Sequence, residues 1–307
     1  MKILITPRSF GKHSDAPFRL LEEKGLVIAR NDTGGIMTEA DMKAAIAGAE
    51  GVIIGVDPLN ADVMAEAPGL RAVAKYGVGT DNIDLEYCAK NDIAVSITTG
   101  ANSEAVADYT FALILALARK VIEIDSRCRE KDWTKITTSD VAGKTLGLIG
   151  LGSIGKGVVR RAKGFGMEVL AYRRNWDAEY GREAGVSLAT VDEICERSDF
   201  ISLHTPLTDE TRNIIGRREL ELMKPGVFIV NTARGGLIDE DALLTMLEEG
   251  RVGGAGLDVF AKEPPEDDRW YALKNVVMGS HCGASTTGAA ESMSMMSAQN
   301  LLKDLGL

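Results

Sequence analysis

The stretch from Thr145 to Ile149, TLGLI, runs directly into GLGSIG at residues 150–155. An apolar strand pattern that leads into G-x-G-x-x-G, followed by a helical pattern and another strand, is typical of a dinucleotide-binding βαβ unit. The first glycine permits a tight turn, the second lets a pyrophosphate approach the backbone, and the third lets helix and strand pack closely. Free N–H groups at the start of the helix would bind the pyrophosphate. The motif therefore predicts a cofactor site at Gly150, Gly152, Ser153, Ile154 and Gly155.

The end of the next predicted strand indicates which dinucleotide binds. An NAD site usually carries an acidic residue about 20 residues after the first glycine, where it accepts hydrogen bonds from the ribose hydroxyls. This chain has Arg173 and Arg174 there instead, directly after Tyr172. Guanidinium groups bind phosphate through charge-assisted, bidentate hydrogen bonds, so the sequence favours NADP(H), which carries a 2′-phosphate. NAD(H) is the alternative if both arginines point into solvent.

Strand and helix patterns alternate on both sides of this motif, which predicts an α/β protein with parallel sheets covered on both faces. From Thr145 onward there are enough strands for a six-stranded, doubly wound Rossmann sheet. A long apolar helix is expected at 103–119, with Asn102 as its N-cap, and a last helix at 285–305. The expected strands are 2–6, 27–29, 51–55, 72–76 and 94–96, followed by 145–149, 168–172, 200–203, 227–231, 254–257 and 276–278.

The composition is that of an ordinary globular protein. The chain has 307 residues, 45% of them hydrophobic and 26% charged, which suits two domains. Its net charge of −10 argues against nucleic acid or an anionic membrane as a partner. Residues 1–7 predict a short strand rather than a signal peptide, and the longest apolar run, 111–118, is shorter than the ~20 residues of a membrane-spanning helix. The scattered cysteines predict neither disulfides nor a metal site and fit a reducing, cytoplasmic setting: Cys88, Cys128, Cys195 and Cys282.

Three segments that follow predicted strands carry side chains suited to reducing a ketone. A histidine is the natural proton donor near neutral pH, and of the three histidines only His281 directly follows the last strand. Arg234 and Glu263 follow the two preceding strands. Because the carboxyl ends of parallel strands meet at one edge of a sheet, we expect these three side chains to converge there. Hydride transfer to a keto acid needs a carboxylate anchor, a polarised carbonyl and a proton donor, which this set can supply.

Several motifs in order resemble the D-isomer-specific 2-hydroxyacid dehydrogenase family over essentially the whole chain. Within that family, the sequence resembles most closely the short 3-phosphoglycerate dehydrogenase-like members. The resemblance implies a smaller, flavodoxin-like substrate domain at 1–98, completed by 285–307, and an NAD(P)-binding Rossmann domain at 99–284. The matching motifs are KYGVGTDNID (75–84), GANSEAVAD (100–108), GLGSIG (150–155), LHTPLTDET (203–211), NTARGGLIDEDAL (231–243), GLDVFAKEPP (256–265) and SHCGAS (280–285).

The resemblance also implies a role for individual residues. Arg234 would anchor the substrate carboxylate and carbonyl, His281 would be the general acid/base, and Glu263 would orient it and keep it protonated. Backbone N–H groups of Val78 and Gly79 would bind the carboxylate, with Tyr76 nearby. Asp258 would contact the nicotinamide carboxamide. The remaining cofactor contacts implied are His204, Thr205, Pro206, Thr232, Ala233 and Gly283.

The substrate stays open between two readings. A 3-phosphoglycerate dehydrogenase needs cationic partners for phosphate, and phosphate-specific relatives often place arginine in the loop 55–59, where this chain has Asp57. Arg8 and Lys75, which follow and end predicted strands, are the cations left for that role. Hydroxypyruvate or glyoxylate reduction is the alternative. A formate dehydrogenase-like activity and a dinucleotide-sensing corepressor, which would bind rather than turn over, fit the residues less well.

The surface of the predicted Rossmann domain indicates an oligomer. The apolar helix at 103–119 and the segment through Trp133 offer more hydrophobic surface than a lone domain needs. Members of the family pair their subunits through this region. The sequence therefore predicts a two-fold symmetric homodimer that acts on a small 2-keto or 2-hydroxy acid.

Overall fold

The computed structural model describes all 307 residues and divides the chain into two compact units. Unit 1 comprises Met1–Asn102 and Ala284–Leu307, and unit 2 comprises Ser103–Gly283. The boundaries expected from the sequence, after residues 98 and 284, lie a few residues from these. None of the helices combines the length and apolar character that crossing a bilayer requires.

Unit 1 is built on a five-stranded parallel sheet with the order β2-β1-β3-β4-β5. This is the flavodoxin-like order, and it confirms the predicted smaller α/β fold. Each strand is short, and all five lie within one or two residues of their expected bounds. The strands are β1 (Lys2–Ile5), β2 (Val27–Arg30), β3 (Gly51–Ile54), β4 (Ala72–Lys75) and β5 (Ala94–Ile97).

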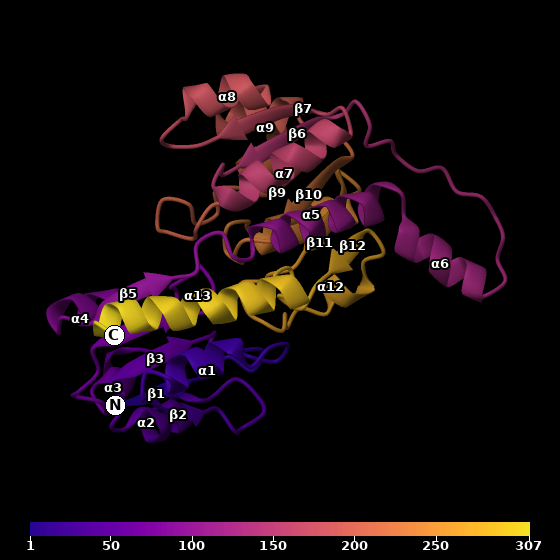
Figure 1. Ribbon diagram of the computed structural model, residues 1–307. Coiled ribbons are helices and arrows are strands. Elements are labelled where there is room, and N and C mark those ends of the chain that lie inside the picture. Colours follow the sequence, from indigo (N-terminus) through magenta and orange to yellow (C-terminus); the bar gives the residue numbers. More distant parts are fainter. The chain divides into compact units, whose positions relative to one another are not determined.

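Alternate residues of these strands enter two separate cores, one on each face of the sheet. On β3, Val52 and Ile54 pack against α2 and α3, whereas Ile53 packs on the opposite face with α1 and α13. The last helix of the chain, α13, runs along this second face beside α1 (Figure 1). The C-terminal helix is thus part of unit 1. The helices of this unit are α1 (Ala16–Glu22), α2 (Glu39–Ile46), α3 (Ala61–Met64), α4 (Leu85–Lys90) and α13 (Thr287–Leu305).

Unit 2 contains a seven-stranded parallel sheet with the order β12-β11-β10-β9-β6-β7-β8. The order reverses between β6 and β9, which is the topological switch point where doubly wound sheets bind ligands. The Rossmann architecture is confirmed, but the expected number of strands is wrong, because Val186–Leu188 adds a short edge strand, β8. The others are β6 (Thr145–Ile149), β7 (Glu168–Tyr172), β9 (Phe200–Leu203), β10 (Val227–Asn231), β11 (Val252–Leu257) and β12 (Val276–Met278).

Helices cover both faces of this sheet. One core joins the sheet to α5 and α7, and the other joins it to α9, α10 and α11. The predicted N-cap of α5 is wrong, because the side-chain oxygen of Asn102 is buried and makes no hydrogen bond. The helices of unit 2 are α5 (Ser103–Ala118), α6 (Val121–Arg129), α7 (Ser153–Gly164), α8 (Ala178–Ala184), α9 (Val191–Arg197), α10 (Arg217–Leu222), α11 (Glu240–Glu248) and α12 (Arg269–Ala272).

Candidate active site

The turn between β6 and α7 has the backbone geometry of a phosphate-binding loop. Gly150 has a φ of +107°, and a Cβ there would lie 2.4 Å from the carbonyl oxygen of His204. A Cβ on Gly155 would lie 2.5 Å from the carbonyl oxygen of Gly150, so helix and turn touch backbone to backbone. Gly152 has no neighbouring atom within 4 Å of its missing side chain. The first and third glycines are therefore required by packing, whereas the second leaves its backbone open to a ligand.

The N-terminus of α7 is open to an anion. Gly152 is its N-cap and supplies no side-chain hydrogen bond to the first N–H groups of the helix, at Ser153 and Ile154. Unpaired N–H groups and the positive end of the helix dipole together favour a bound phosphate. The residues present thus fit the pyrophosphate of a dinucleotide.

The predicted cofactor residues His204, Thr205 and Pro206 follow β9, the neighbour of β6 at the switch point. The N–H of His204 donates to the Ile149 carbonyl oxygen at 2.7 Å, which holds the two strand ends together. The imidazole Nε2 lies 2.9 Å from the Ser202 hydroxyl, while Nδ1 is buried with no hydrogen-bond partner. Burial lowers the pKa of His204 to about 4, so the ring is neutral at neutral pH. A neutral ring with an unpaired nitrogen agrees with the expectation that His204 is not the catalytic acid.

Other predicted cofactor residues sit at the same edge of the sheet. Thr205 and Pro206 continue the chain after His204, and Thr232 and Ala233 follow β10. The Thr232 hydroxyl lies 3.0 Å from that of Thr110 on α5. These loops adjoin because β9 and β10 are paired neighbours in the sheet.

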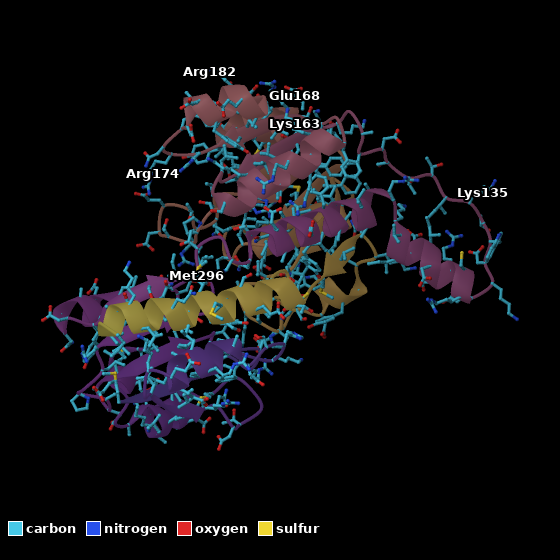
Figure 2. The ribbon with its side chains drawn as sticks, in the orientation of Figure 1. Lys135, Lys163, Glu168, Arg174, Arg182 and Met296 are labelled. Atoms are coloured by element: carbon cyan, nitrogen blue, oxygen red, sulfur yellow. The ribbon has the colours of Figure 1, made fainter.

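The two arginines after β7 have different surroundings. Arg174 is exposed and forms an ion pair with Glu210, which lies in the loop after β9, at 2.8 Å. Figure 2 labels Arg174 at the outer edge of unit 2. Arg173 is half-buried and lies near Asp177. The N–H of Tyr180 and, to a lesser degree, Lys156 and Arg173 lower the pKa of Asp177. Arg173 therefore lies near a group of charged side chains that follows β7.

Glu263 and His281 are in direct contact. Glu263 Oε2 lies 2.9 Å from His281 Nδ1, and its Oε1 accepts a hydrogen bond from the Phe260 N–H at 3.2 Å. This leaves Nε2 as the ring nitrogen that can exchange a proton with a ligand. Both side chains are about two-fifths exposed, at 38% and 41%. The pair has the geometry of a general acid held by a carboxylate.

The backbone around His281 is held in an uncommon conformation. His281 has a φ of +57°, in the left-handed region that non-glycine residues rarely adopt. Its N–H donates to the Asp258 carbonyl oxygen at 2.8 Å. The Asp258 carboxylate, almost fully buried, accepts from the N–H groups of Cys282 at 2.9 Å and Gly283 at 2.8 Å. Asp258 thus fixes the turn that carries His281.

Arg234 lies in the loop after β10, which packs tightly on the loop that carries Glu263. The loop is shaped by Asn231, whose side-chain amide donates to the Arg234 carbonyl oxygen at 2.7 Å. A Cβ on Gly235 would lie 2.0 Å from the Phe260 carbonyl carbon. The two loops therefore touch through their backbones. The structure brings Arg234, Glu263 and His281 to the same edge of the sheet of unit 2.

The predicted substrate residues Arg8, Tyr76, Val78 and Gly79 all belong to unit 1. Arg8 is exposed and donates to the Gly34 carbonyl oxygen at 3.3 Å. The Tyr76 hydroxyl accepts from Ser9 and donates to the Ala290 carbonyl oxygen, both at 3.1 Å. Tyr76 therefore ties its strand to α13 and to the loop after β1.

In the loop at 55–59, where phosphate-specific relatives often place arginine, this chain has side chains with a structural role. Asp57 is buried, accepts from the Met37 N–H at 2.9 Å and is hydrogen-bonded by the Thr6 hydroxyl. Lys75 is also buried, where it donates to the Gly55 carbonyl oxygen and, at 2.7 Å, to the Asn82 side chain. Both charged groups are engaged in holding the loops of unit 1.

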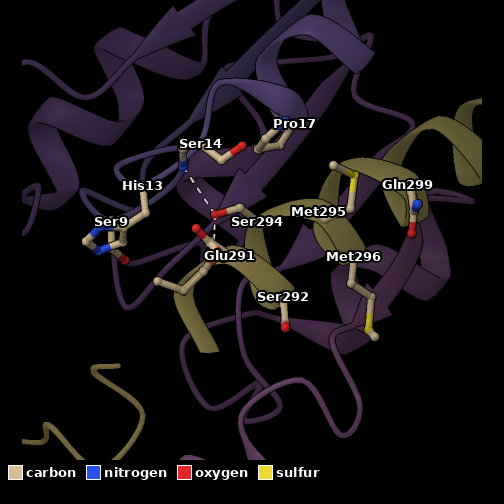
Figure 3. Close-up of a pocket in the computed structure, with 12 residues that line it drawn as sticks. Ser9, His13, Ser14, Pro17, Glu291, Ser292, Ser294, Met295, Met296 and Gln299 are labelled. Atoms are coloured by element: carbon tan, nitrogen blue, oxygen red, sulfur yellow. Dashed lines mark hydrogen bonds between the residues drawn. The ribbon is translucent and has the colours of Figure 1, made fainter. Parts of the chain in front are cut away.

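A cavity of about 510 Å³ lies in unit 1 between the loop after β1 and α13 (Figure 3). The Gly11 N–H donates to the Ser294 hydroxyl at 3.2 Å and joins the two walls. No sequence motif signals it, because its walls are 283 residues apart in the chain. Its lining side chains include Ser9, His13, Ser14, Glu291, Met295 and Gln299.

Tyr109 on α5 is a site residue that the sequence reasoning missed. A Cβ on Gly279 would lie 2.7 Å from the Tyr109 hydroxyl and 2.2 Å from Asp258 Oδ1, so the phenol packs against the turn before His281. Burial, together with Cys282 and Asp258, raises the pKa of Tyr109. The apolar character of α5 predicted only a core or interface helix, and nothing in its spacing indicates this contact.

Comparison with known proteins identifies the family. The family model for the NAD-binding domain of D-isomer specific 2-hydroxyacid dehydrogenases matches residues 111–283. A glyoxylate reductase from Thermococcus litoralis is 42% identical over 260 residues, which cover 82% of this chain and 78% of that protein. The D-3-phosphoglycerate dehydrogenase of Methanocaldococcus jannaschii is 40% identical over 309 residues, covering 99% of this chain and 57% of that protein.

Solved structures agree with this result. The TT0316 protein from Thermus thermophilus superimposes with a TM-score of 0.90 at 37% identity, covering 100% of this chain and 97% of that one. The matching family model is that of an NAD-binding domain, and the two sequence relatives are named a reductase and a dehydrogenase. The chain belongs to the D-isomer-specific 2-hydroxyacid dehydrogenases and is an NAD(P)-dependent oxidoreductase.

Proposed function

We propose that this dehydrogenase reduces small 2-keto acids of the glyoxylate and hydroxypyruvate type, with NADPH as the preferred cofactor and as a homodimer. The observation that carries the chemistry is the 2.9 Å contact between Glu263 and His281, at the same sheet edge as Arg234. A dinucleotide sensor without turnover would need no such pair. The glyoxylate reductase similarity supports the substrate class.

Each polar group at the site has a distinct task in this proposal. The Arg234 guanidinium binds the substrate carboxylate and polarises its carbonyl. His281 donates its Nε2 proton to the carbonyl oxygen, and Glu263 stabilises the charged imidazole through Nδ1. Bound NAD(P)H supplies the hydride that reduces the carbonyl carbon. The N–H groups of Val78 and Gly79 bind the carboxylate.

The positively charged side chains of unit 1 support a substrate without a phosphate group. A phosphate group on the substrate needs charge-assisted hydrogen bonds, but Asp57 occupies the loop in question and its carboxylate is buried. Lys75 is buried against Gly55 and Asn82. Arg8, which is exposed, is the cation that could serve a phosphate. Together with the similarity to a D-3-phosphoglycerate dehydrogenase over 99% of the chain, it makes 3-phosphohydroxypyruvate the second candidate substrate.

A panel of keto acids separates the two substrates. We expect kcat/KM for glyoxylate and hydroxypyruvate to exceed that for 3-phosphohydroxypyruvate about tenfold or more, because one missing charge-assisted hydrogen bond costs roughly 1.5–3 kcal/mol and ~1.4 kcal/mol is tenfold. Initial rates of NADPH oxidation give the values. Arg8→Ala is the matched variant: a rise in KM confined to the phosphorylated acid, together with a higher wild-type kcat/KM for that acid, would establish phosphoglycerate dehydrogenase activity instead.

The homodimer is proposed from the surface of α6 and the segment that follows it. No residue of α6 is buried, and Val121 and Ile122 are 53% and 56% exposed. Trp133 is 80% exposed in the segment that leads away from the helix past Lys135 (Figures 1 and 2). Exposed apolar side chains of this size mark a protein-protein contact when they are grouped. A second copy of the chain would cover them.

Light scattering at micromolar concentration tests the dimer. We expect twice the chain mass of 32.9 kDa for the wild type and the chain mass for Ile122→Asp, because a buried carboxylate at the interface is unfavourable. Ile36→Asp, at a residue 59% exposed in unit 1, is the control and should remain dimeric. A monomeric wild type would refute the proposal.

A further inference from the structure

Glu240 connects the two loops that carry the proposed catalytic residues. Glu240 is the first residue of α11. The N-cap of this helix, Asp239, is the last residue of the loop between β10 and α11, which contains Arg234. The half-buried carboxylate does not pair with a cation. Its Oε1 accepts a hydrogen bond from the Ala261 N–H at 2.6 Å. The side chain of Glu240, on the helix that follows the Arg234 loop, thus holds the backbone of the loop that carries Glu263.

The backbone that Glu240 holds leads directly to the acid/base pair. Ala261 adjoins Phe260, whose N–H donates to Glu263 Oε1 at 3.2 Å. Glu263 Oε2 in turn lies 2.9 Å from His281 Nδ1. Moving the backbone at 260–261 would therefore move the carboxylate that orients the imidazole.

The same peptide is fixed from a second direction. A Cβ on Gly235 would lie 2.0 Å from the Phe260 carbonyl carbon and 2.2 Å from the Ala261 nitrogen, so the Arg234 loop leaves this peptide no space on that side. The Glu240 hydrogen bond completes the constraint. The charged groups near Glu240 are acidic: Asp241 on its own helix and Glu263 on the facing loop both raise the pKa of Glu240, after burial as the largest cause. The Ala261 N–H needs an acceptor oxygen at this position, which a neutral side chain of the same length would also supply.

We propose that Glu240 is a positioning residue for the Glu263–His281 pair, acting through the Ala261 N–H. This inference rests on the acid/base role of that pair proposed above. Misplacing a catalytic group by about 1 Å can cost up to 10²-fold in rate. In this role Glu240 affects the geometry of the Glu263–His281 pair, and it does not contact the pyrophosphate loop at 150–155.

Three substitutions separate hydrogen-bond geometry from charge. Glu240→Gln keeps an acceptor oxygen at the same reach, Glu240→Asp keeps the charge but is one methylene too short, and Glu240→Ala loses both. In the keto-acid assay we expect Glu240→Gln to stay within about threefold of wild type and the other two to lose roughly tenfold to 10²-fold in kcat. KM for NADPH should change by less than about twofold, a split that general destabilisation would not produce.

Asp241→Ala is the matched control. Asp241 is also an acidic residue in the first turn of α11, its side chain is 88% exposed, and it pairs with Arg269 rather than with the 258–263 loop. It removes the same charge from the same helix terminus and should retain near-wild-type kcat. A Glu240→Ala enzyme with normal kcat would overturn the positioning role, and so would a Glu240→Gln enzyme as impaired as Glu240→Ala.

His281→Ala in the same assay keeps this proposal distinct from the proposed function. If His281→Ala turns over normally, the acid/base assignment fails and Glu240 has no pair to position. If His281→Ala is inactive while Glu240→Ala is normal, the assignment stands and the positioning role is overturned. Should Glu240→Ala fail to fold, the comparison of Glu240→Gln with Glu240→Asp still decides between geometry and charge.

Discussion

Replacing His281 with alanine is expected to lower kcat for keto-acid reduction by ~10²–10⁴, the usual scale for a general acid. In the proposed mechanism the His281 imidazole, which lies against Glu263, is the proton donor, and the other histidine of unit 2 has different surroundings. His204 is neutral, its Nδ1 is buried and its Nε2 contacts Ser202. The alanine variant leaves the glycine loop and the α7 N-terminus intact, so cofactor binding should survive.

Two measurements on the purified variant check this. Steady-state kinetics give kcat, and titration of the nicotinamide fluorescence gives the Kd for NADPH, which should stay within about threefold of wild type. His13→Ala, in the cavity of unit 1, is the control histidine and should keep its turnover. Near-normal turnover of His281→Ala would remove this residue from the mechanism.

The second large effect concerns the cofactor: we expect wild-type kcat/KM for NADPH to exceed that for NADH about tenfold or more, and Arg173→Asp to invert the preference. Arg173 follows β7, where a carboxylate would accept hydrogen bonds from the ribose and repel a 2′-phosphate. A charge-assisted hydrogen bond is worth roughly 1.5–3 kcal/mol, and ~1.4 kcal/mol is tenfold. Arg174 contributes less in this account, because Glu210 already pairs with it at 2.8 Å.

Kinetics of wild type and variant with both nucleotides measure the switch. Arg182→Asp makes the same charge change in the last turn of α8 and controls for net charge. It should leave the NADPH/NADH ratio unchanged. If wild type prefers NADH, Arg173 does not engage a 2′-phosphate, and the NADP(H) assignment falls while the family assignment stays.

The sequence predicted those parts of the molecule that are governed by local rules. Backbone rules locate β6, the glycine turn and α7, because only glycine tolerates the positive φ at 150 and the close contact at 155. The same rules locate the loop ends that carry Arg234, Glu263 and His281, since parallel strands bring their carboxyl ends together. They do not locate β8, because this edge strand has three residues and Leu188 is 55% exposed. Such a short segment has no apolar alternation that could be recognised in the sequence.

Side-chain partners far apart in the chain could not be predicted in this way. The Glu240 contact to the Ala261 N–H spans 21 residues, and the Arg174–Glu210 pair spans 36. Each depends on how two loops pack, which no periodicity encodes. Asp57 reads in sequence as a misplaced acidic residue in a binding loop, but in the fold it is a buried acceptor for Met37 and Thr6. Asn102 shows the converse, since a residue typical of helix caps makes no cap here.

The stereochemistry of the product tests whether the protein is a D-specific 2-keto acid reductase. Purified protein is incubated with hydroxypyruvate and NADPH, in parallel with NADH, and the glycerate formed is resolved by chiral chromatography. A D-2-hydroxyacid dehydrogenase that presents hydride and the His281 proton to one fixed orientation of the substrate must yield D-glycerate alone, in amounts equal to the nucleotide oxidised. L-glycerate, a racemic product, or no oxidation of either nucleotide with any keto acid of the panel would contradict the account.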